Sequence, residues 1–280
     1  MKLSEMRETL AARGIQLSKS LGQNFLHDGN QLRRIVEAAE LSKNDKVLEI
    51  GPGLGPLTEM LVERAGEILA IEKDVRLVEV LRERLNVVGQ EASPLRLAHD
   101  DALEFLRREP SDWSDWKLVA NLPYSVASPI LVELAQNPRR PERMVVTLQL
   151  EVSRRLMAKP GEKDYGVLTL LIRLDYEPRD WFKIPATCFF PAPDVDSACV
   201  TLLRRERPLL ANQNREAFVR IIKRAFSQRR KMMFKLLKED WAEQMLERAM
   251  ISSELSSQIR AEAVSLEQFV QLTERLSTFQ

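Results

Sequence analysis

The sequence predicts an α/β protein: a doubly wound, Rossmann-like sheet whose last strand is antiparallel, followed by a small all-helical C-terminal domain. Short apolar runs alternate with helical patterns as far as Leu150, a glycine-rich turn follows the first strand-like run, and the pattern after Pro208 is helical to the end. Apolar strands that alternate with helices indicate a parallel sheet covered on both faces. A chain of 280 residues is long enough for a main domain and a smaller one.

Five strands and the helices between them follow from the spacing of the apolar residues. The predicted strands are residues 46–50, 68–72, 95–99, 117–121 and 143–150. The predicted helices are residues 29–41, 56–65, 75–85 and 127–136, with a short amphipathic helix at the N-terminus. Asp28 or Asn30 is expected to cap the first of these four helices, and Pro56 suits a first turn because the N–H it lacks would be unpaired there.

Two later apolar runs, residues 166–177 and 195–205, are expected to form the last strands. Only the proline-rich loop at residues 184–194 and no helical pattern separates them, so they are predicted to close the sheet as an antiparallel hairpin. The sheet domain is therefore expected to span residues 1–206, and the helical domain residues 207–280.

Composition argues against several classes of protein. Hydrophobic residues make up 44% and charged residues 30%, as in an ordinary globular protein, and no apolar run approaches the roughly 20 residues of a membrane span. The charged N-terminus lacks the apolar stretch of a secretory signal, so a cytoplasmic protein is expected. The two cysteines, Cys188 and Cys199, and the two histidines, His27 and His99, lack the spacing of metal ligands, and no metal is expected.

Positive charge is concentrated in one stretch although the net charge is only +1. Residues 204–238 contain twelve basic and two acidic residues, a net charge of +10, so the rest of the chain carries −9. The stretch includes Arg229, Arg230 and Lys231 in succession. Such asymmetry indicates a surface that faces a polyanion, and the alternative is a solvated helical face balanced by acids on neighbouring elements.

The glycine-rich turn at residues 47–61, VLEIGPGLGPLTEML, reads strand, turn, helix. Gly51, Gly53 and Gly55 permit a tight turn and a close approach of the backbone to a ligand. A nicotinamide-binding loop would have its third glycine at position 56, which is Pro56 here. A dinucleotide also needs a helix N-terminus for its pyrophosphate, whereas S-adenosylmethionine has no phosphate. The loop therefore favours S-adenosylmethionine over a nicotinamide.

Acidic residues follow the next two strands. Glu72 lies about 20 residues after the glycines, where a carboxylate can accept hydrogen bonds from ribose hydroxyls. A plain structural turn would not require an acid at that distance. Asp100 and Asp101 follow the third strand, where one of them could accept a hydrogen bond from the adenine amine of the cofactor. The alternative is a cap for the helix at residues 102–108, and each aspartate could do one job.

The tetrapeptide Asn121-Leu122-Pro123-Tyr124, directly after the fourth strand, carries the most specific chemistry. The exocyclic amine of adenine is a poor nucleophile because its lone pair is delocalised into the ring. The Asn121 side-chain carbonyl and the Leu122 backbone carbonyl can each accept one N–H, which localises the lone pair and aims it at a methyl group. Pro123 stiffens the turn, and Tyr124 offers a face on which an extruded base can stack. The alternative is an ordinary type I turn.

On these motifs the chain resembles the ribosomal RNA small-subunit adenine dimethyltransferase family, from about Leu17 to the C-terminus. The segments that carry the resemblance are SKSLGQNFLHD (18–28), VLEIGPGLGPLTEML (47–61), IEKD (71–74), DDAL (100–103), NLPYSVASPIL (121–131), LQLEVSRRLMAKPGEKDYGVLTLL (148–171), CFFPAPDVDSACV (188–200) and AFSQRRKMMFKLL (225–237). The chain departs from the family pattern at Leu150, at Asp194 and at residues 232–237, outside the glycine turn and the tetrapeptide.

The resemblance implies a role for each matching position. The residues implied to bind S-adenosylmethionine are Asn24, Leu26, Gly51, Gly53, Glu72, Asp101 and Asn121, with the segment SKSLGQNFL as a lid. Asn121 to Tyr124 form the catalytic motif, and Phe189 packs on the target base. Residues 1–206 are then the methyltransferase domain, and residues 207–280, with Arg229, Arg230 and Lys231, bind RNA.

The implied reaction is N6,N6-dimethylation of two adjacent adenosines in a hairpin near the 3′ end of 16S (small-subunit) rRNA. The implied partner is that RNA within an immature ribosomal subunit, where the protein can also take part in assembly, and we expect a monomer without metal or membrane. Three alternatives remain: a resistance-type methyltransferase of large-subunit rRNA, a non-catalytic assembly or transcription factor on the same fold, and a nicotinamide oxidoreductase. The tetrapeptide argues against the last two.

Overall fold

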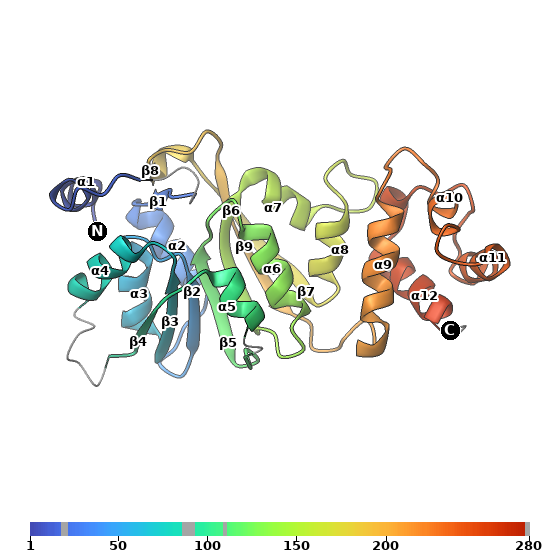
Figure 1. The fold of residues 1–280 in the computed structure, drawn as a ribbon, viewed down its shortest axis with the longest axis horizontal. Coiled ribbons are helices and arrows are strands. Elements are labelled where there is room, and N and C mark those ends of the chain that lie inside the picture. Colours follow the sequence, from blue (N-terminus) through green and yellow to red (C-terminus); the bar gives the residue numbers. More distant parts are fainter. Residues whose placement is uncertain (18–21, 86–92, 109–110, 278–280) are drawn as a thin grey trace. The chain divides into compact units, whose positions relative to one another are not determined.

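The computed structural model describes residues 1–17, 22–85, 93–108 and 111–277 (Figure 1). The chain forms two compact units. The first consists of Met1–Ser153 and Pro178–Arg204, and the second of Arg154–Glu177 and Arg205–Gln280. These units differ from the expected domains chiefly in residues 154–177, which group with the helical part. The domain limits 1–206 and 207–280 stay a prediction about independent folding and function.

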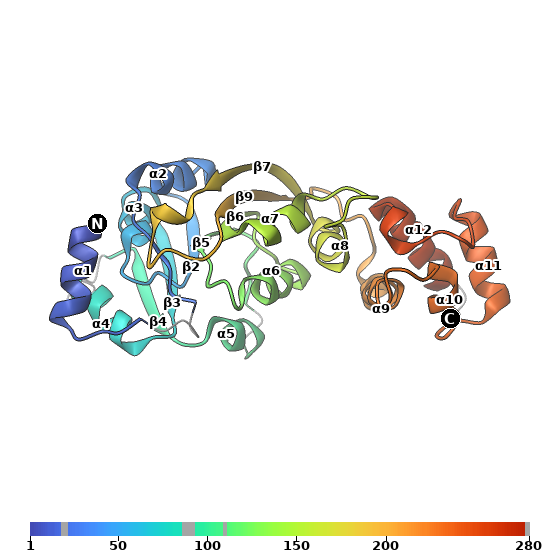
Figure 2. The same ribbon diagram turned by 90° about the horizontal axis from the view of Figure 1, so that it is seen from above.

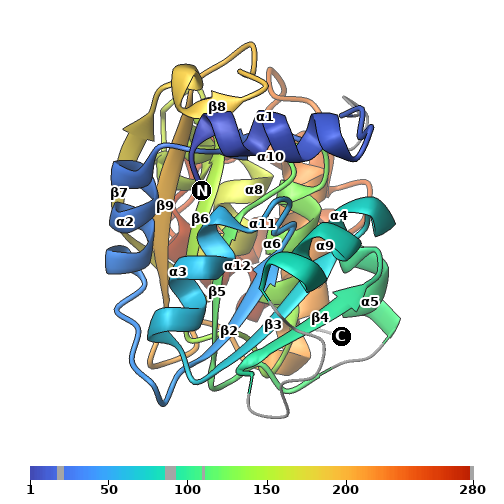
Figure 3. The same ribbon diagram turned by 90° about the vertical axis from the view of Figure 1, so that its left-hand side faces the viewer.

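A seven-stranded sheet forms the centre of the first unit, in the order β4-β3-β2-β5-β6-β9-β7 (Figure 3). Its strands are β2 (Lys46–Ile50), β3 (Glu67–Glu72), β4 (Leu95–His99), β5 (Trp116–Asn121), β6 (Arg143–Gln149), β7 (Tyr176–Ile184) and β9 (Ser197–Arg204). The first five of these strands pair in parallel, and β9 runs antiparallel to β6. The predicted doubly wound sheet and its antiparallel closing strand are therefore confirmed.

Helices cover both faces of this sheet. The helices that precede β6 in the chain are α1 (Leu3–Ala12), α2 (Gly29–Ala38), α3 (Pro56–Arg64), α4 (Val75–Arg84), α5 (Ala102–Arg108) and α6 (Ala127–Gln136). Helices α2 and α3 lie on one face, and α5 and α6 on the other (Figure 2). Asp28, not Asn30, caps α2, because its carboxylate accepts hydrogen bonds from the backbone N–H groups of Asn30 and Gln31.

The predicted strand at residues 166–177 is wrong. Val167–Arg173 form a helix, α8, which follows helix α7 (Leu150–Met157). Of the predicted strand, only Tyr176 and Glu177 belong to β7. A helix of seven residues spans two turns, too few for its apolar positions to be told from those of a buried strand. The Thr169 hydroxyl accepts from the Gly166 N–H and donates to the carbonyl of Arg155, which fixes the start of α8.

A two-stranded antiparallel sheet, which the sequence did not predict, joins β1 (Phe25–Leu26) to β8 (Phe189–Phe190). It links the segment before α2 to the proline-rich loop, with Leu26 opposite Phe189. Both of these side chains are 2% exposed and belong to the apolar core between α2, α3 and the sheet. This small sheet therefore joins the segment before α2 to the loop that precedes β9.

Helices dominate the second unit: α9 (Arg215–Ala225), α10 (Met233–Leu237), α11 (Glu243–Ser252) and α12 (Leu266–Ser277) follow α8. Phe218, Ile221, Ile222 and Ala225 of α9 are buried. Within the described ranges, no helix combines the length and the apolar character needed to cross a membrane.

Candidate active site

A pocket lies at the carboxyl ends of β2, β3, β4 and β5, and the empty space in it together with the solvent at its mouth is about 830 Å³. The strand order reverses between β2 and β5, and ligands of doubly wound sheets bind outside such a switch point. Of the seven cofactor residues expected from the sequence, six line the pocket: Asn24, Gly51, Gly53, Glu72, Asp101 and Asn121. Leu26 does not line it and is buried in the core. Residues 18–21 of the expected lid lie outside the described residues.

Gly53 shapes the floor of the pocket. Its φ is +62°, a conformation that L side chains rarely adopt, and a Cβ there would lie 2.6 Å from the Phe25 ring. Phe25 also lines the pocket and belongs to the same apolar cluster as Met6 and Leu10 of α1. The glycine turn and the segment before α2 are therefore in direct contact, and no side chain would fit between them.

The Glu72 carboxylate is fixed by backbone amides. Its Oε2 accepts from the Gly53 N–H at 3.0 Å, and its Oε1 accepts from the Asp74 N–H at 2.9 Å. Burial raises the pKa of Glu72, and these amide hydrogen bonds oppose the rise. A carboxylate has about four acceptor sites, so these amides leave capacity to accept from a ligand hydroxyl.

Asp101 both caps a helix and faces the pocket. Its Oδ1 accepts from the N–H groups of Leu103 and Glu104 at the start of α5. Its Oδ2 lies 2.8 Å from the Lys73 Nζ, and this hydrogen bond to the ammonium lowers the pKa of Asp101. Asp100 instead pairs with Arg108 at 2.6 Å. The sequence allowed either aspartate to cap α5, and the structure shows that Asp101 does so.

The side-chain amide of Asn121 is oriented by a single hydrogen bond. Its Nδ2 donates to the backbone carbonyl of Asn24 at 2.9 Å. Its Oδ1 is buried and has no hydrogen-bond partner among the described residues. An unpaired buried acceptor costs about 1–3 kcal/mol, so native proteins rarely keep one without a use. The oxygen at the end of β5 is a fixed acceptor beside the pocket.

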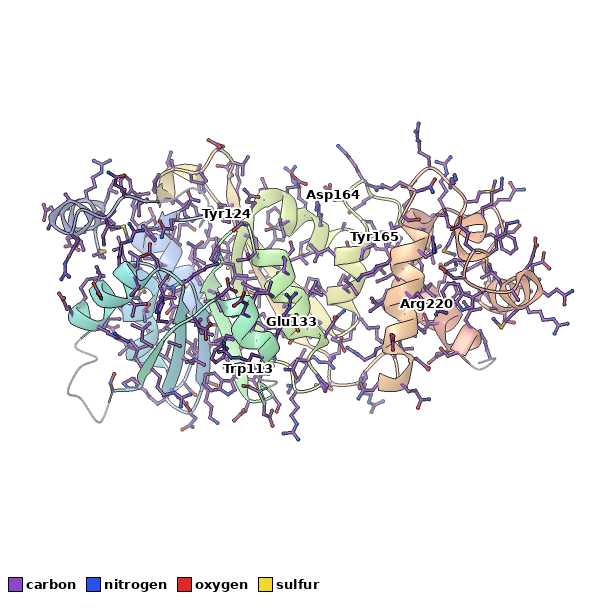
Figure 4. The ribbon with its side chains drawn as sticks, viewed as in Figure 1. Trp113, Tyr124, Glu133, Asp164, Tyr165 and Arg220 are labelled. Carbon is purple, nitrogen blue, oxygen red and sulfur yellow. The ribbon has the colours of Figure 1, made fainter. Side chains whose placement is uncertain are left out.

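The other members of the tetrapeptide differ in exposure. Pro123 lines the pocket, and Leu122 is 1% exposed. Tyr124, which is labelled in Figure 4, is half-buried. The Tyr124 hydroxyl lies 2.6 Å from the Ser197 hydroxyl, and burial raises the pKa of Tyr124. Phe189 is 2% exposed within the core and does not line the pocket, so its expected contact with a base stays a prediction.

Glu49, which the sequence reasoning missed, is a second buried carboxyl near the pocket. It is 1% exposed, its Oε2 has no hydrogen-bond partner among the described residues, and burial raises its pKa to about 8. The charge of Glu72 adds to this rise. An acid inside the apolar strand KVLEI was the available signal. In the described part of the chain, no three acidic, histidine or cysteine side chains converge as metal ligands.

The basic cluster of the second unit divides into paired and unpaired side chains. Arg229 donates to the carbonyl of Lys163 at 2.7 Å and lies 3.6 Å from a Glu262 oxygen. Arg230 and Lys231 are exposed and make no ion pair with any described residue. Glu239 and Asp240, the acids that could have neutralised the cluster, pair instead with Arg224.

Comparison with known proteins decides the family. A family model described as "Ribosomal RNA adenine dimethylase" matches residues 14–278. The chain belongs to this family. A "Ribosomal RNA small subunit methyltransferase A" of Geobacillus sp. (strain WCH70) is 38% identical over 96% of this chain and 95% of its own length. The protein of the same name from Streptococcus gordonii is 37% identical over 98% of this chain and 97% of its own length.

Two solved structures are similar to this chain. The crystal structure of the 23S rRNA methyltransferase ErmE is similar with a TM-score of 0.69 and 31% identity, covering 91% of this chain and all of that one. A dimethyladenosine transferase from Plasmodium falciparum is similar with a TM-score of 0.73 at 23% identity, covering 89% of this chain and 95% of that one. The second likeness supports the fold alone.

Gly53→Ala is expected to destabilise this dimethylase-family protein more than Gly14→Ala. Both glycines have nearly the same positive φ, +62° and +61°, but a Cβ at Gly14 meets nothing within 4 Å. The difference isolates the contact with Phe25, and overpacking of this kind typically costs about 1–3 kcal/mol. Urea unfolding of both variants measures this difference in the free energy of unfolding. Equal destabilisation would show that the Phe25 ring can move aside without an energetic cost.

Glu49→Gln is expected to flatten the pH dependence of stability. The folded pKa of Glu49, about 8, lies above its ordinary value of 4.5, so the unfolded chain loses the proton first and stability falls as pH rises between these values. The slope within that window is about 1.4 kcal/mol per pH unit at most. Denaturant unfolding at pH 6 and pH 8 should show the same fall in the parent protein and in the exposed control Glu63→Gln, and a smaller fall in Glu49→Gln, where Glu72 still has a raised pKa. An equal fall in all three would assign the dependence to other groups.

Proposed function

We propose that this chain uses S-adenosylmethionine to dimethylate N6 of two adjacent adenosines in a hairpin near the 3′ end of small-subunit (16S) rRNA. The proposal rests on Asn121 Oδ1 at the carboxyl end of β5. This oxygen lies beside the pocket, is buried, and has no hydrogen-bond partner among the described residues. The names of relatives that match nearly the whole chain support the small subunit as the substrate.

The pocket fits S-adenosylmethionine. The Gly53 turn leaves room for a ligand close to the backbone, and the Glu72 carboxylate is held with free lone pairs where ribose hydroxyls would bind. Asp101 is in reach of the other end of a ligand that extends across β2 to β4. These carboxylates also suit a sulfonium cation better than a pyrophosphate. When bound, the cofactor supplies an electrophilic methyl group.

The residues of the chain position the amine. Asn121 Oδ1 accepts one N–H of the adenine amine, and the Leu122 carbonyl accepts the other, so the lone pair is localised and aimed at the pocket. Because the Asn121 amide is already oriented by the Asn24 carbonyl, little reorganisation is needed during reaction. Tyr124 stacks on the base, and the nitrogen releases one proton to water after it gains the methyl group, so no general base is required.

A large-subunit rRNA methyltransferase is the second candidate, because the ErmE structure is 31% identical and covers 91% of this chain. The relatives named for the small subunit are 37–38% identical. Their names favour the first candidate. The non-catalytic alternative is opposed by the intact tetrapeptide, although a part in small-subunit assembly is compatible with catalysis and stays a prediction.

Methyl transfer from labelled S-adenosylmethionine tests the proposal. The purified protein is incubated with naked small-subunit RNA, with immature small subunits or with large-subunit RNA, and the modified nucleotides are mapped. The proposal expects two adjacent N6,N6-dimethyladenosines in the small-subunit hairpin. Label confined to large-subunit RNA would establish the second candidate, and label in none of the three would contradict both.

Arg230→Ala/Lys231→Ala is expected to weaken RNA binding without a loss of thermal stability. Both side chains are exposed and unpaired, and each phosphate contact removed should lower the slope of log affinity against log salt by about one unit. Arg229→Ala should instead lower the melting temperature, because Arg229 holds the carbonyl of Lys163. Binding across a salt series, with thermal melts, measures both. An unchanged slope in the double variant would remove this cluster from the RNA surface.

A further inference from the structure

We infer that Ser197 is a positioning residue that holds the Tyr124 ring in the orientation needed to stack on the target base. The inference rests on the proposed function. The two hydroxyl oxygens lie 2.6 Å apart although 73 residues separate them in the chain. Ser197 is fully buried and Tyr124 is half-buried, so this hydrogen bond is largely shielded from water.

Ser197 belongs to a rigid part of the first unit. It opens β9 and pairs in register with Gln149 at the end of β6. The preceding residue, Asp196, is held three times: its carbonyl accepts from the Leu150 N–H, its Oδ1 accepts from the Ala186 N–H, and its Oδ2 lies 2.6 Å from the Lys183 ammonium. The serine hydroxyl is therefore a fixed point.

Tyr124 needs such a point because it lies in a turn. Its backbone follows β5, and the turn is closed by the hydrogen bond from the Val126 N–H to the Pro123 carbonyl. That bond fixes the backbone but leaves the ring free to rotate about its side-chain torsions. The hydroxyl bond to Ser197 ties down the far end of the ring, so a base that stacks on it meets a surface already oriented.

If Ser197 positions the Tyr124 ring, the effect of replacing Ser197 depends on the Tyr124 hydroxyl. If Ser197 is only structural, it does not. Ser153 offers a matched control, because it is also a buried serine of the first unit, and its hydroxyl donates to the Gln149 carbonyl at 3.3 Å. Ser153→Ala removes a comparable hydroxyl far from the tetrapeptide in sequence. A loss of transfer rate that both Ser153→Ala and Ser197→Ala show reflects a loss of stability. Any further loss in Ser197→Ala reflects the orientation of the Tyr124 ring.

The experiment is a double-mutant cycle of Ser197→Ala and Tyr124→Phe in single-turnover methyl transfer. Each single variant should slow transfer about tenfold, the double variant no more than either, and Ser153→Ala not at all. Affinity for S-adenosylmethionine should not change. Multiplying effects in the double variant, or full activity of Ser197→Ala, would overturn the inference.

A second readout separates this inference from the proposed function. The chain has three tyrosines, so ring-labelled protein gives few NMR signals, and Ser197→Ala should shift and narrow that of Tyr124. An unchanged Tyr124 signal would overturn the inference whatever the substrate. If the parent protein methylates none of the RNAs, the proposed function fails, and the NMR comparison still decides whether Ser197 orients the ring.

Discussion

The hydrogen bond from the Asn121 Nδ2 to the carbonyl of Asn24 decides what the site can do. Without it the amide could rotate, and either its oxygen or its nitrogen could face the pocket. With it, the nitrogen is committed to the backbone and the oxygen remains as an acceptor. The fold supplies both partners: β5 ends at Asn121 between two parallel neighbours, and the short β1 that follows Asn24 is paired with β8.

Two carboxyl groups are buried near the glycine turn at a cost in folding free energy. Glu49 and Glu72 are both buried, and each raises the free energy of the folded chain when it is charged. Backbone N–H groups, those of Gly53 and Asp74 among them, compensate Glu72, whereas Glu49 Oε2 has no partner among the described residues. Of the two, only Glu72 lines the pocket, and the amide of Gly53 in the glycine turn is one of the groups that stabilise its charged form there.

The parallel strands could be predicted because each is an apolar run bounded by turn residues, and the pocket residues follow from their position at strand ends. The helix Val167–Arg173 could not, because its two turns carry no readable period. The β1–β8 pairing also escaped prediction, since two-residue strands have no pattern and depend on contacts distant in sequence. Family resemblance proposed roles for Leu26 and Phe189, but only the structure places both side chains in the core.

The basic stretch could be predicted from the distribution of charge, but the partners of its individual side chains could not. Arg224, Arg229 and Arg230 look equivalent in sequence, yet Arg224 is neutralised by two acids and Arg229 is tied to a backbone carbonyl. Arg230 is exposed without an ion pair to any described residue. The partner of a long basic side chain depends on which residues lie near it in the folded protein, and the local sequence pattern does not specify this.

The most direct measurement pairs the transfer rate of Asn121→Ala with its free energy of unfolding. If the oxygen is held for the substrate, single-turnover transfer should fall about a hundredfold or more, equivalent to about 3 kcal/mol of barrier. Stability should stay within about 1 kcal/mol of the parent, because the change removes one hydrogen bond together with one unpaired acceptor. The exposed Asn44→Ala is the matched control. Transfer at the parent rate by Asn121→Ala would contradict the account.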